Sequence, residues 1–177
     1  SIDGAVASPT ASLHFTPALL KNLDSCGIKI IPITLHVGAG TFFPIRSEQI
    51  EHHKMHSEWI EVSPSAAAQI NETRNKGGRV VAVGTTVLRT LEAVSDANQT
   101  VHPYTGYTDI FISPGYKFNI VDLLLTNFHL PKSTLFILVS AFCGLNRMKN
   151  VYKYAIHNKY RFFSYGDTTL LEINENL

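Results

Sequence analysis

Proton-transferring side chains occur in three separated parts of the sequence. The first part holds His53, His56 and Glu58, the second holds His129, and the third holds Asp167. Imidazole changes its charge near neutral pH and a carboxylate accepts a proton, so these residues suit general acid–base catalysis. His129 is equally compatible with a core histidine bonded to the backbone, and Asp167 with a turn residue.

The two histidines before Glu58 also have the residue types of a zinc site. If this segment is helical, His53 and His56 share a face, and Glu58 is near enough in sequence to join them as a third ligand. No further cluster with zinc-like spacing occurs in the sequence. We therefore expect no metal and prefer an acid–base role, while His52 fits a solvated polar loop.

Segment 34–44 is the end of an apolar run that breaks at two glycines. Gly38 and Gly40 are preceded by His36 and followed by Thr41. Glycine lets a ligand approach the main chain, and ligands of open α/β sheets bind where strands end. The alternative is a strand-to-loop turn that needs glycine only for its geometry.

A second candidate binding segment is Gly84-Thr85-Thr86, at an expected strand-to-helix junction. The free N–H groups and the positive end of the helix dipole favour an anion, and Arg89, about one turn further, could add a charged donor. Helix capping by threonine explains the same residues. Asn127, in the loop before the next apolar helix, also follows a buried run and marks another strand end.

One long segment is positively charged. Between Leu123 and Gly166 there is no Asp or Glu. Tyr152, Tyr154 and Tyr160 are interleaved with the basic residues, which favours a surface for a nucleic-acid backbone over an ordinary solvated helix face. The basic residues of this segment are Lys132, Arg147, Lys149, Lys153, Lys159 and Arg161.

The elements that must position these residues follow from caps, glycines and apolar periodicity. Helices are expected at 17–26, 64–76, 86–94 and 133–142, with a further helical stripe from Met148 to Ile156. Strands are expected at 28–37, 57–62, 79–83, 109–113, 120–125 and 160–165. Pro32 restricts the first of these strands to an edge or a bulge. Repeated helix–glycine–strand units predict the α/β class, with a mixed, partly parallel sheet flanked by helices.

The bulk properties exclude several other classes of protein. The 177 residues carry a net charge of +1 and no internal repeat, which fits one α/β domain over 1–177. Two cysteines, Cys26 and Cys143, cannot form a framework of disulfides. The first residues lack the pattern of a signal peptide, and the longest apolar run is shorter than the ~20 residues of a membrane helix. We expect a cytoplasmic, monomeric protein without a membrane partner.

Several segments together resemble one family, the S-adenosylmethionine:tRNA ribosyltransferase-isomerases of queuosine biosynthesis. The matches follow the family order over nearly the whole chain, and their combination is highly specific. They include Ser-Pro-Thr-Ala-Ser-Leu-His-Phe at 8–15, His-Lys-Met-His-Ser-Glu at 53–58, Thr-Asn-Phe-His-Leu-Pro at 126–131 and Tyr-Arg-Phe-Phe-Ser-Tyr-Gly-Asp at 160–167. Further matches lie at 34–42, at 81–86 with Arg89, at 111–116 and at 121–122.

The resemblance implies transfer of the ribosyl moiety of S-adenosylmethionine to a 7-aminomethyl-7-deazaguanine in tRNA. The product would be epoxyqueuosine-tRNA, with adenine and methionine released. S-adenosylmethionine would be a co-substrate, and no permanently bound cofactor is implied. Thr10 and His14 would join the glycine and threonine segments in binding it, while His53, His56 or His129, with Glu58 or Asp167, would move the protons.

One difference from the family matters. Its members carry a further N-terminal portion, including a β-barrel domain, before the Pro9-Thr10 motif, so this chain resembles the C-terminal part of the enzyme. Two alternatives follow: a catalytically inactive tRNA-binding fragment, or a metal-dependent hydrolase that uses His53, His56 and Glu58. In the enzymatic interpretation, His36, His53, Thr85 and His129 should surround one shared hollow.

Overall fold

The computed structural model describes residues 10–36 and 55–174, which form two small sheets and several helices. The first sheet is antiparallel and has the order β1-β2-β4, from Thr34–His36, Glu58–Val62 and Tyr104–Thr108. The second has the order β3-β5-β6, from Val81–Val83, Leu123–Asn127 and Thr168–Glu172. In it β3 runs parallel to β5 and β6 runs antiparallel, which confirms the expected α/β class with a partly parallel sheet, although the strands form two sheets.

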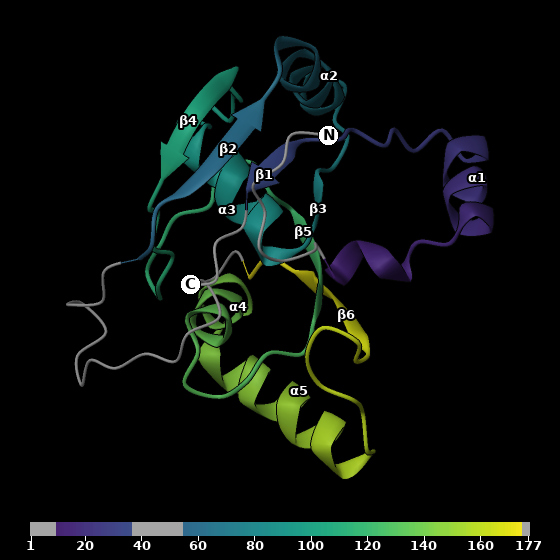
Figure 1. Cartoon of the computed structure of the whole chain (residues 1–177), viewed down its shortest axis with the longest axis vertical. Coiled ribbons are helices and arrows are strands. Elements are labelled where there is room, and N and C mark those ends of the chain that lie inside the picture. Colours follow the sequence, from purple (N-terminus) through teal and green to yellow (C-terminus); the bar gives the residue numbers. More distant parts are fainter. Residues whose placement is uncertain (1–9, 37–54, 175–177) are drawn as a thin grey trace.

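The helices begin where capping residues occur in the sequence. Side-chain oxygens of Thr16, Ser63 and Ser133 accept backbone N–H groups in the first turns of α1, α2 and α4. These helices span Pro17–Ser25, Pro64–Asn75 and Thr134–Cys143. The remaining helices are α3 (Thr85–Ala93), α5 (Leu145–His157) and a short 3-10 helix, η1 (Thr10–His14). α1 lies apart from the rest in Figure 1, and none of its residues is buried.

Helix α3 lies between the two sheets (Figure 1). Thr85 and the run from Leu88 to Glu92 are buried, so this helix is covered on almost every side. Glu92 uses its carboxylate to accept the backbone N–H groups of Asn119, Ile120 and Val121, just before β5. Burial raises the pKa of Glu92 against the lowering effect of these bonds. The helix thus fixes the approach to the strand that carries Asn127.

Three expected strands were wrong or much shorter than predicted. Of the described residues in segment 28–37, only Thr34–His36 pair, because Pro32 lacks an N–H and the exposed side chains of Ile28 and Ile30 have no sheet to cover. Segment 109–113 is unpaired, and the carbonyl of Ile110 instead accepts a hydrogen bond from Arg89. The strand that precedes this segment in the chain is β4, which the sequence pattern did not predict.

Segment 160–165 is also a loop, and the last strand, β6, follows it. The side chain of Phe162 packs against Phe128 and Tyr152, which explains its apolar character without a strand. In α5, Met148 and Tyr152 are buried as the stripe predicts, but Ile156 at its end is 66% exposed. Within the described residues, the helices are too short or too polar to cross a membrane.

Candidate functional site

Asn127 is the centre of a polar cluster at the carboxyl end of β5. Its Oδ1 accepts a hydrogen bond from Oγ1 of Thr10 at 3.4 Å, and its Nδ2 lies 3.1 Å from Nε2 of His14. The same Nδ2 donates to the carbonyl of Gly166 at 3.4 Å. Asn127 is 5% exposed. One buried amide therefore joins η1, the end of β5 and the loop before β6, and we call Thr10, His14, Asn127 and Asp167 the strand-end cluster.

Asp167 belongs to this cluster but is engaged by Arg161. Its Oδ2 accepts the backbone N–H of Arg161 at 2.7 Å, and its Oδ1 lies 3.2 Å from the guanidinium. These hydrogen bonds lower the pKa of Asp167, with a smaller contribution from the charge of His14. The carboxylate is thus ionised and holds a turn closed, as the turn alternative predicts; its role as a catalytic base stays a prediction.

The start of α3 lies against the same end of the sheet. Gly84 is the N-cap, with φ of +100°, and no side chain caps the helix, so capping by threonine was wrong. The N–H of Gly84 donates to the carbonyl of Leu125 in β5 at 2.8 Å. A Cβ at Gly84 would lie 3.8 Å from that of Ala11 in η1. A helix N-terminus without a side-chain cap therefore lies beside Thr10, where its dipole favours an anionic group.

His129 follows Asn127 but makes different contacts. Its backbone N–H donates to the hydroxyl of Tyr152 at 2.9 Å, and its Nε2 lies 3.3 Å from Oγ1 of Thr126. Its Nδ1 is buried and has no hydrogen-bond partner among the described residues. Burial lowers the pKa of His129 to about 4, so the imidazole is neutral at pH 7. A neutral imidazole can accept a proton but has none to give as an imidazolium.

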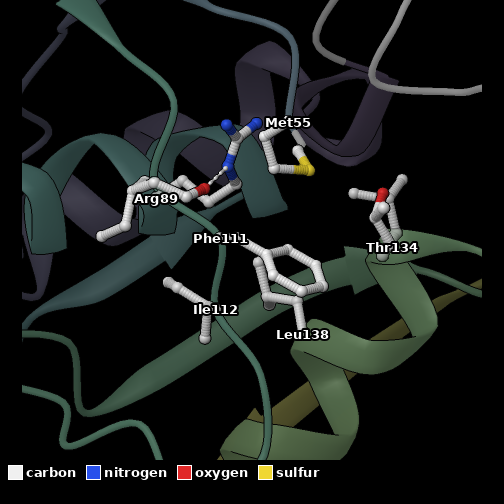
Figure 2. Close-up of a pocket in the computed structure, with 8 residues that line it drawn as sticks. Met55, Arg89, Phe111, Ile112, Thr134 and Leu138 are labelled. Carbon is white, nitrogen blue, oxygen red and sulfur yellow. Dashed lines mark hydrogen bonds between the residues drawn. The ribbon is translucent and has the colours of Figure 1, made fainter. Parts of the chain in front are cut away.

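Arg89 and Glu58 form an ion pair between α3 and β2. Arg89 donates through Nη1 to Glu58 at 2.5 Å and through Nε to the carbonyl of Ile110 at 3.1 Å, and both charged side chains are 2% exposed. Nη2 of Arg89 is buried without a hydrogen-bond partner in the described part of the chain. Figure 2 shows the guanidinium beside a small hollow, with Met55 close to it and Thr134 across from it. The hollow is lined by Met55, Arg89, Ile110, Phe111, Ile112, Thr134, Leu135 and Leu138.

The other predicted site residues are distributed more widely. His36 packs against Trp59 in the first sheet, with ring centroids 4.6 Å apart. His56 lies in an irregular segment before β2 and not in a helix, and no group of three potential metal ligands occurs among the described residues. Neither His36, Thr85 nor His129 lines the hollow beside Arg89, so this hollow is not the shared one that was expected. His53, Gly38, Gly40 and Thr41 lie outside the described residues, and Thr86 follows Thr85 in the first turn of α3.

The basic residues lie on the surface, in α5 and in the segments before α4 and after α5. Lys132, Arg147, Lys149, Lys153 and Arg161 are all exposed. Tyr152 is buried and so was wrongly grouped with them, whereas Tyr154 and Tyr160 are exposed, with ring centroids 6.3 Å apart. Phe163 and Tyr165 are exposed as well and were missed, because the segment read as a strand. The Gly166-Asp167 turn directly after them was the available signal for a loop.

Comparison with known proteins gives one consistent result. The model of the queuosine biosynthesis protein family matches residues 1–171. The S-adenosylmethionine:tRNA ribosyltransferase-isomerase of Parvibaculum lavamentivorans is 58% identical over 168 residues, 95% of this chain and 48% of that protein. The protein of the same name from Gluconobacter oxydans is 60% identical over 169 residues, 96% of this chain and 48% of its own length.

A solved structure agrees with these relatives. The crystal structure of S-adenosylmethionine tRNA ribosyltransferase from Thermotoga maritima has a TM-score of 0.74 and 40% identity, and the match covers 90% of this chain and 50% of that one. The chain spans about half the length of the curated relatives that it matches.

Proposed function

Because the chain belongs to the queuosine biosynthesis protein family, we propose that it serves in the transfer of ribose from S-adenosylmethionine to tRNA. The acceptor is a 7-aminomethyl-7-deazaguanine base, and the products are epoxyqueuosine-tRNA, adenine and methionine. S-adenosylmethionine is a co-substrate in this proposal, and no metal or resident cofactor is required. We further propose that residues 1–177 form one α/β domain of a monomeric cytoplasmic protein.

The observation that carries this proposal is the strand-end cluster beside the start of α3. The parallel strands β3 and β5 end at the same edge of their sheet, and ligands of α/β sheets bind at such edges. Thr10, His14 and Asn127 offer hydroxyl, imidazole and amide groups there. These groups suit a nucleoside, while the N–H groups at Thr85 and Thr86 suit an anion such as a carboxylate.

Arg89 supplies a second anion-binding group in the proposal. Its Nη2 lies free of hydrogen bonds within the described residues, and its other nitrogens are held by Glu58 and Ile110. A guanidinium fixed on two sides is preorganised for a carboxylate. Its Nη2 is buried, so the proposal requires the small hollow beside it to open for the ligand. The remaining residues proposed for co-substrate binding are His36, Gly38, Gly40, Thr41 and Gly84.

The proton transfers divide according to the surroundings of the side chains. The sulfonium of the co-substrate acidifies the adjacent C5′ position, so a base must remove a proton there, and adenine leaves more easily when protonated. With a pKa of about 4, His129 can serve as a base or a hydrogen-bond acceptor but not as the acid. The other proposed proton-transfer groups are His53 and His56, with the carboxylate of Glu58, paired with Arg89, or of Asp167, paired with Arg161.

The test is release of adenine from S-adenosylmethionine in the presence of tRNA that carries the deazaguanine. Asn127→Ala should lower the rate at least tenfold, because it removes the amide that joins Thr10, His14 and Gly166. Lys29→Ala is the control. It removes an exposed ion pair with Glu72 and should keep the full rate. An unchanged rate in Asn127→Ala would remove the strand-end cluster from the site.

The alternative function is that of a tRNA-binding part without turnover, which the comparisons do not favour. That protein would bind tRNA in a salt-sensitive manner through the exposed basic residues around α5, yet release no adenine. Measuring tRNA binding and adenine release on the same preparation separates the two functions. Adding a full-length relative as a positive control shows that the modified tRNA is a competent substrate.

A further inference from the structure

The loop between α5 and β6 exposes large aromatic rings. Tyr165 is 85% exposed and Phe163 is 53% exposed, and Tyr160 at the start of the loop is 41% exposed. We call residues 160–166 the aromatic loop. Large rings cost free energy when they are left in water, so a group of them on one surface loop marks a binding site.

The aromatic loop is closed by several backbone hydrogen bonds. The N–H of Gly166 donates to the carbonyl of Phe163 at 2.9 Å, and the N–H of Asp167 donates to that of Arg161 at 2.9 Å. The N–H of Phe163 donates at 3.0 Å to the carbonyl of Phe128, which ties the loop to the segment after β5. These bonds, with the carboxylate of Asp167, hold the loop in one shape.

Phe163 has an unusual backbone conformation within this loop. Its φ is +70°, in the left-handed region that bulky residues rarely adopt. Such strain persists only where the surrounding structure enforces it, and it is concentrated at functional sites. The strain here places an apolar ring toward solvent, where it contributes little to the core, so binding is the better explanation for it.

The charge around the aromatic loop identifies the kind of ligand. No Asp or Glu occurs from Leu123 to Gly166, and the exposed cations Lys159 and Arg161 lie on either side of Tyr160, with Arg161 also paired with Asp167. Rings mixed with exposed cations match unpaired RNA bases and their phosphates. Bases in single-stranded loops stack on aromatic rings in a way that is largely independent of sequence.

The position of the loop relates it to the strand-end cluster. The carbonyl of Gly166, the last residue of the aromatic loop, accepts a hydrogen bond from Nδ2 of Asn127. We propose that the aromatic loop, chiefly Tyr165 with Phe163, stacks on unpaired anticodon-loop bases next to the base that enters the strand-end cluster. This inference rests on the proposed function for the identity of the RNA, but the stacking itself needs only a single-stranded loop.

The test measures binding of a fluorescently labelled anticodon stem–loop to the whole chain. Tyr165→Ala should weaken binding about 5- to 100-fold, whereas Tyr165→Phe should stay within about twofold because it keeps the ring. Tyr165→Leu should behave like the alanine variant, since an aliphatic side chain cannot stack. Tyr107→Ala is the matched control, because Tyr107 is 68% exposed on β4 in the other sheet. A blunt duplex without a loop should bind all five proteins equally.

Two results would overturn the inference. One is binding of the stem–loop by Tyr165→Ala that equals that of Tyr107→Ala, and the other is a wild-type chain that does not bind the stem–loop. Failure of the proposed function looks different: the wild type then releases no adenine, while the loss of stem–loop binding in Tyr165→Ala persists. If adenine is released, Tyr165→Ala should raise the KM for tRNA by the same factor as it weakens binding.

Discussion

Replacing Arg89 by methionine should destabilise the protein more than most single substitutions. The change leaves the carboxylate of Glu58 buried without its cation and the carbonyl of Ile110 without its donor. Because both partners are 2% exposed, water cannot replace the lost bonds. Breaking a buried ion pair by removing one partner costs about 3–5 kcal/mol, a large part of the ~5–15 kcal/mol that stabilises a typical domain.

Equilibrium unfolding in urea measures this effect. With a slope of about 2 kcal/mol per molar urea, the midpoint of Arg89→Met should fall by about 1.5–2.5 M. The double variant Glu58→Gln with Arg89→Met should recover part of this loss, because no unpaired charge is then buried. The pair Lys29–Glu72 provides the control, since its side chains are 50% and 47% exposed and Lys29→Ala should cost less than about 1 kcal/mol.

A midpoint shift in Arg89→Met that is no larger than the shift in Lys29→Ala would contradict the high cost of breaking this buried ion pair. The ion pair would then be hydrated in solution, contrary to its burial in the structure. A double variant that is less stable than Arg89→Met would count against the buried-charge explanation alone, since packing of the guanidinium stem would then dominate.

Three further predictions concern other parts of the fold. Burial lowers the pKa of His129 from 6.5 to about 4, so on acidification the unfolded chain binds a proton at this histidine before the folded chain does. The contribution to the free energy of unfolding is therefore fully present above pH 6.5 and falls by about 3 kcal/mol toward pH 4. Urea unfolding of His129→Gln at several pH values should lack this part of the pH dependence. Gly166→Ala should open the aromatic loop, because a Cβ there would lie 2.6 Å from the carbonyl oxygen of Phe162. Proteolysis within residues 160–167 should then be faster than in the wild type, and an equal rate of cleavage would contradict the prediction. Ser63→Ala should lower the free energy of unfolding by about 1 kcal/mol, because Oγ of Ser63 accepts the N–H of Ala66 at 3.1 Å; thermal unfolding checks this, and an unchanged Tm would exclude the cap.

The helices could be predicted from the sequence because their signals are local. Thr16 and Ser63 precede prolines, and their hydroxyls cap the helices that begin there. The wrong strands fail for the opposite reason, since pairing depends on distant partners. Phe162 is apolar because it packs against Phe128 and Tyr152, and the carbonyl of Ile110 is satisfied by Arg89. Periodicity cannot distinguish such tertiary contacts from a ladder.

The candidate site was predictable in its residues but not in its arrangement. Asn127 was named from its position at a strand end, and Thr10 and His14 through the family resemblance; the structure brings them together across more than a hundred residues of sequence. The pairing of Glu58 with Arg89 could not be predicted, because the two residues are 31 positions apart and no local sequence pattern connects them. Glu92 was not named as a site residue at all, since nothing near it in sequence reveals the backbone N–H groups it accepts.

The burial of α3 between the two sheets has a consequence for how the molecule opens. Glu58 in β2 cannot separate from Arg89 in α3, nor α3 from the backbone before β5, without exposing buried charge. The two sheets should therefore unfold as one cooperative unit, and backbone amides of β2 and β5 should exchange with deuterium through the same opening.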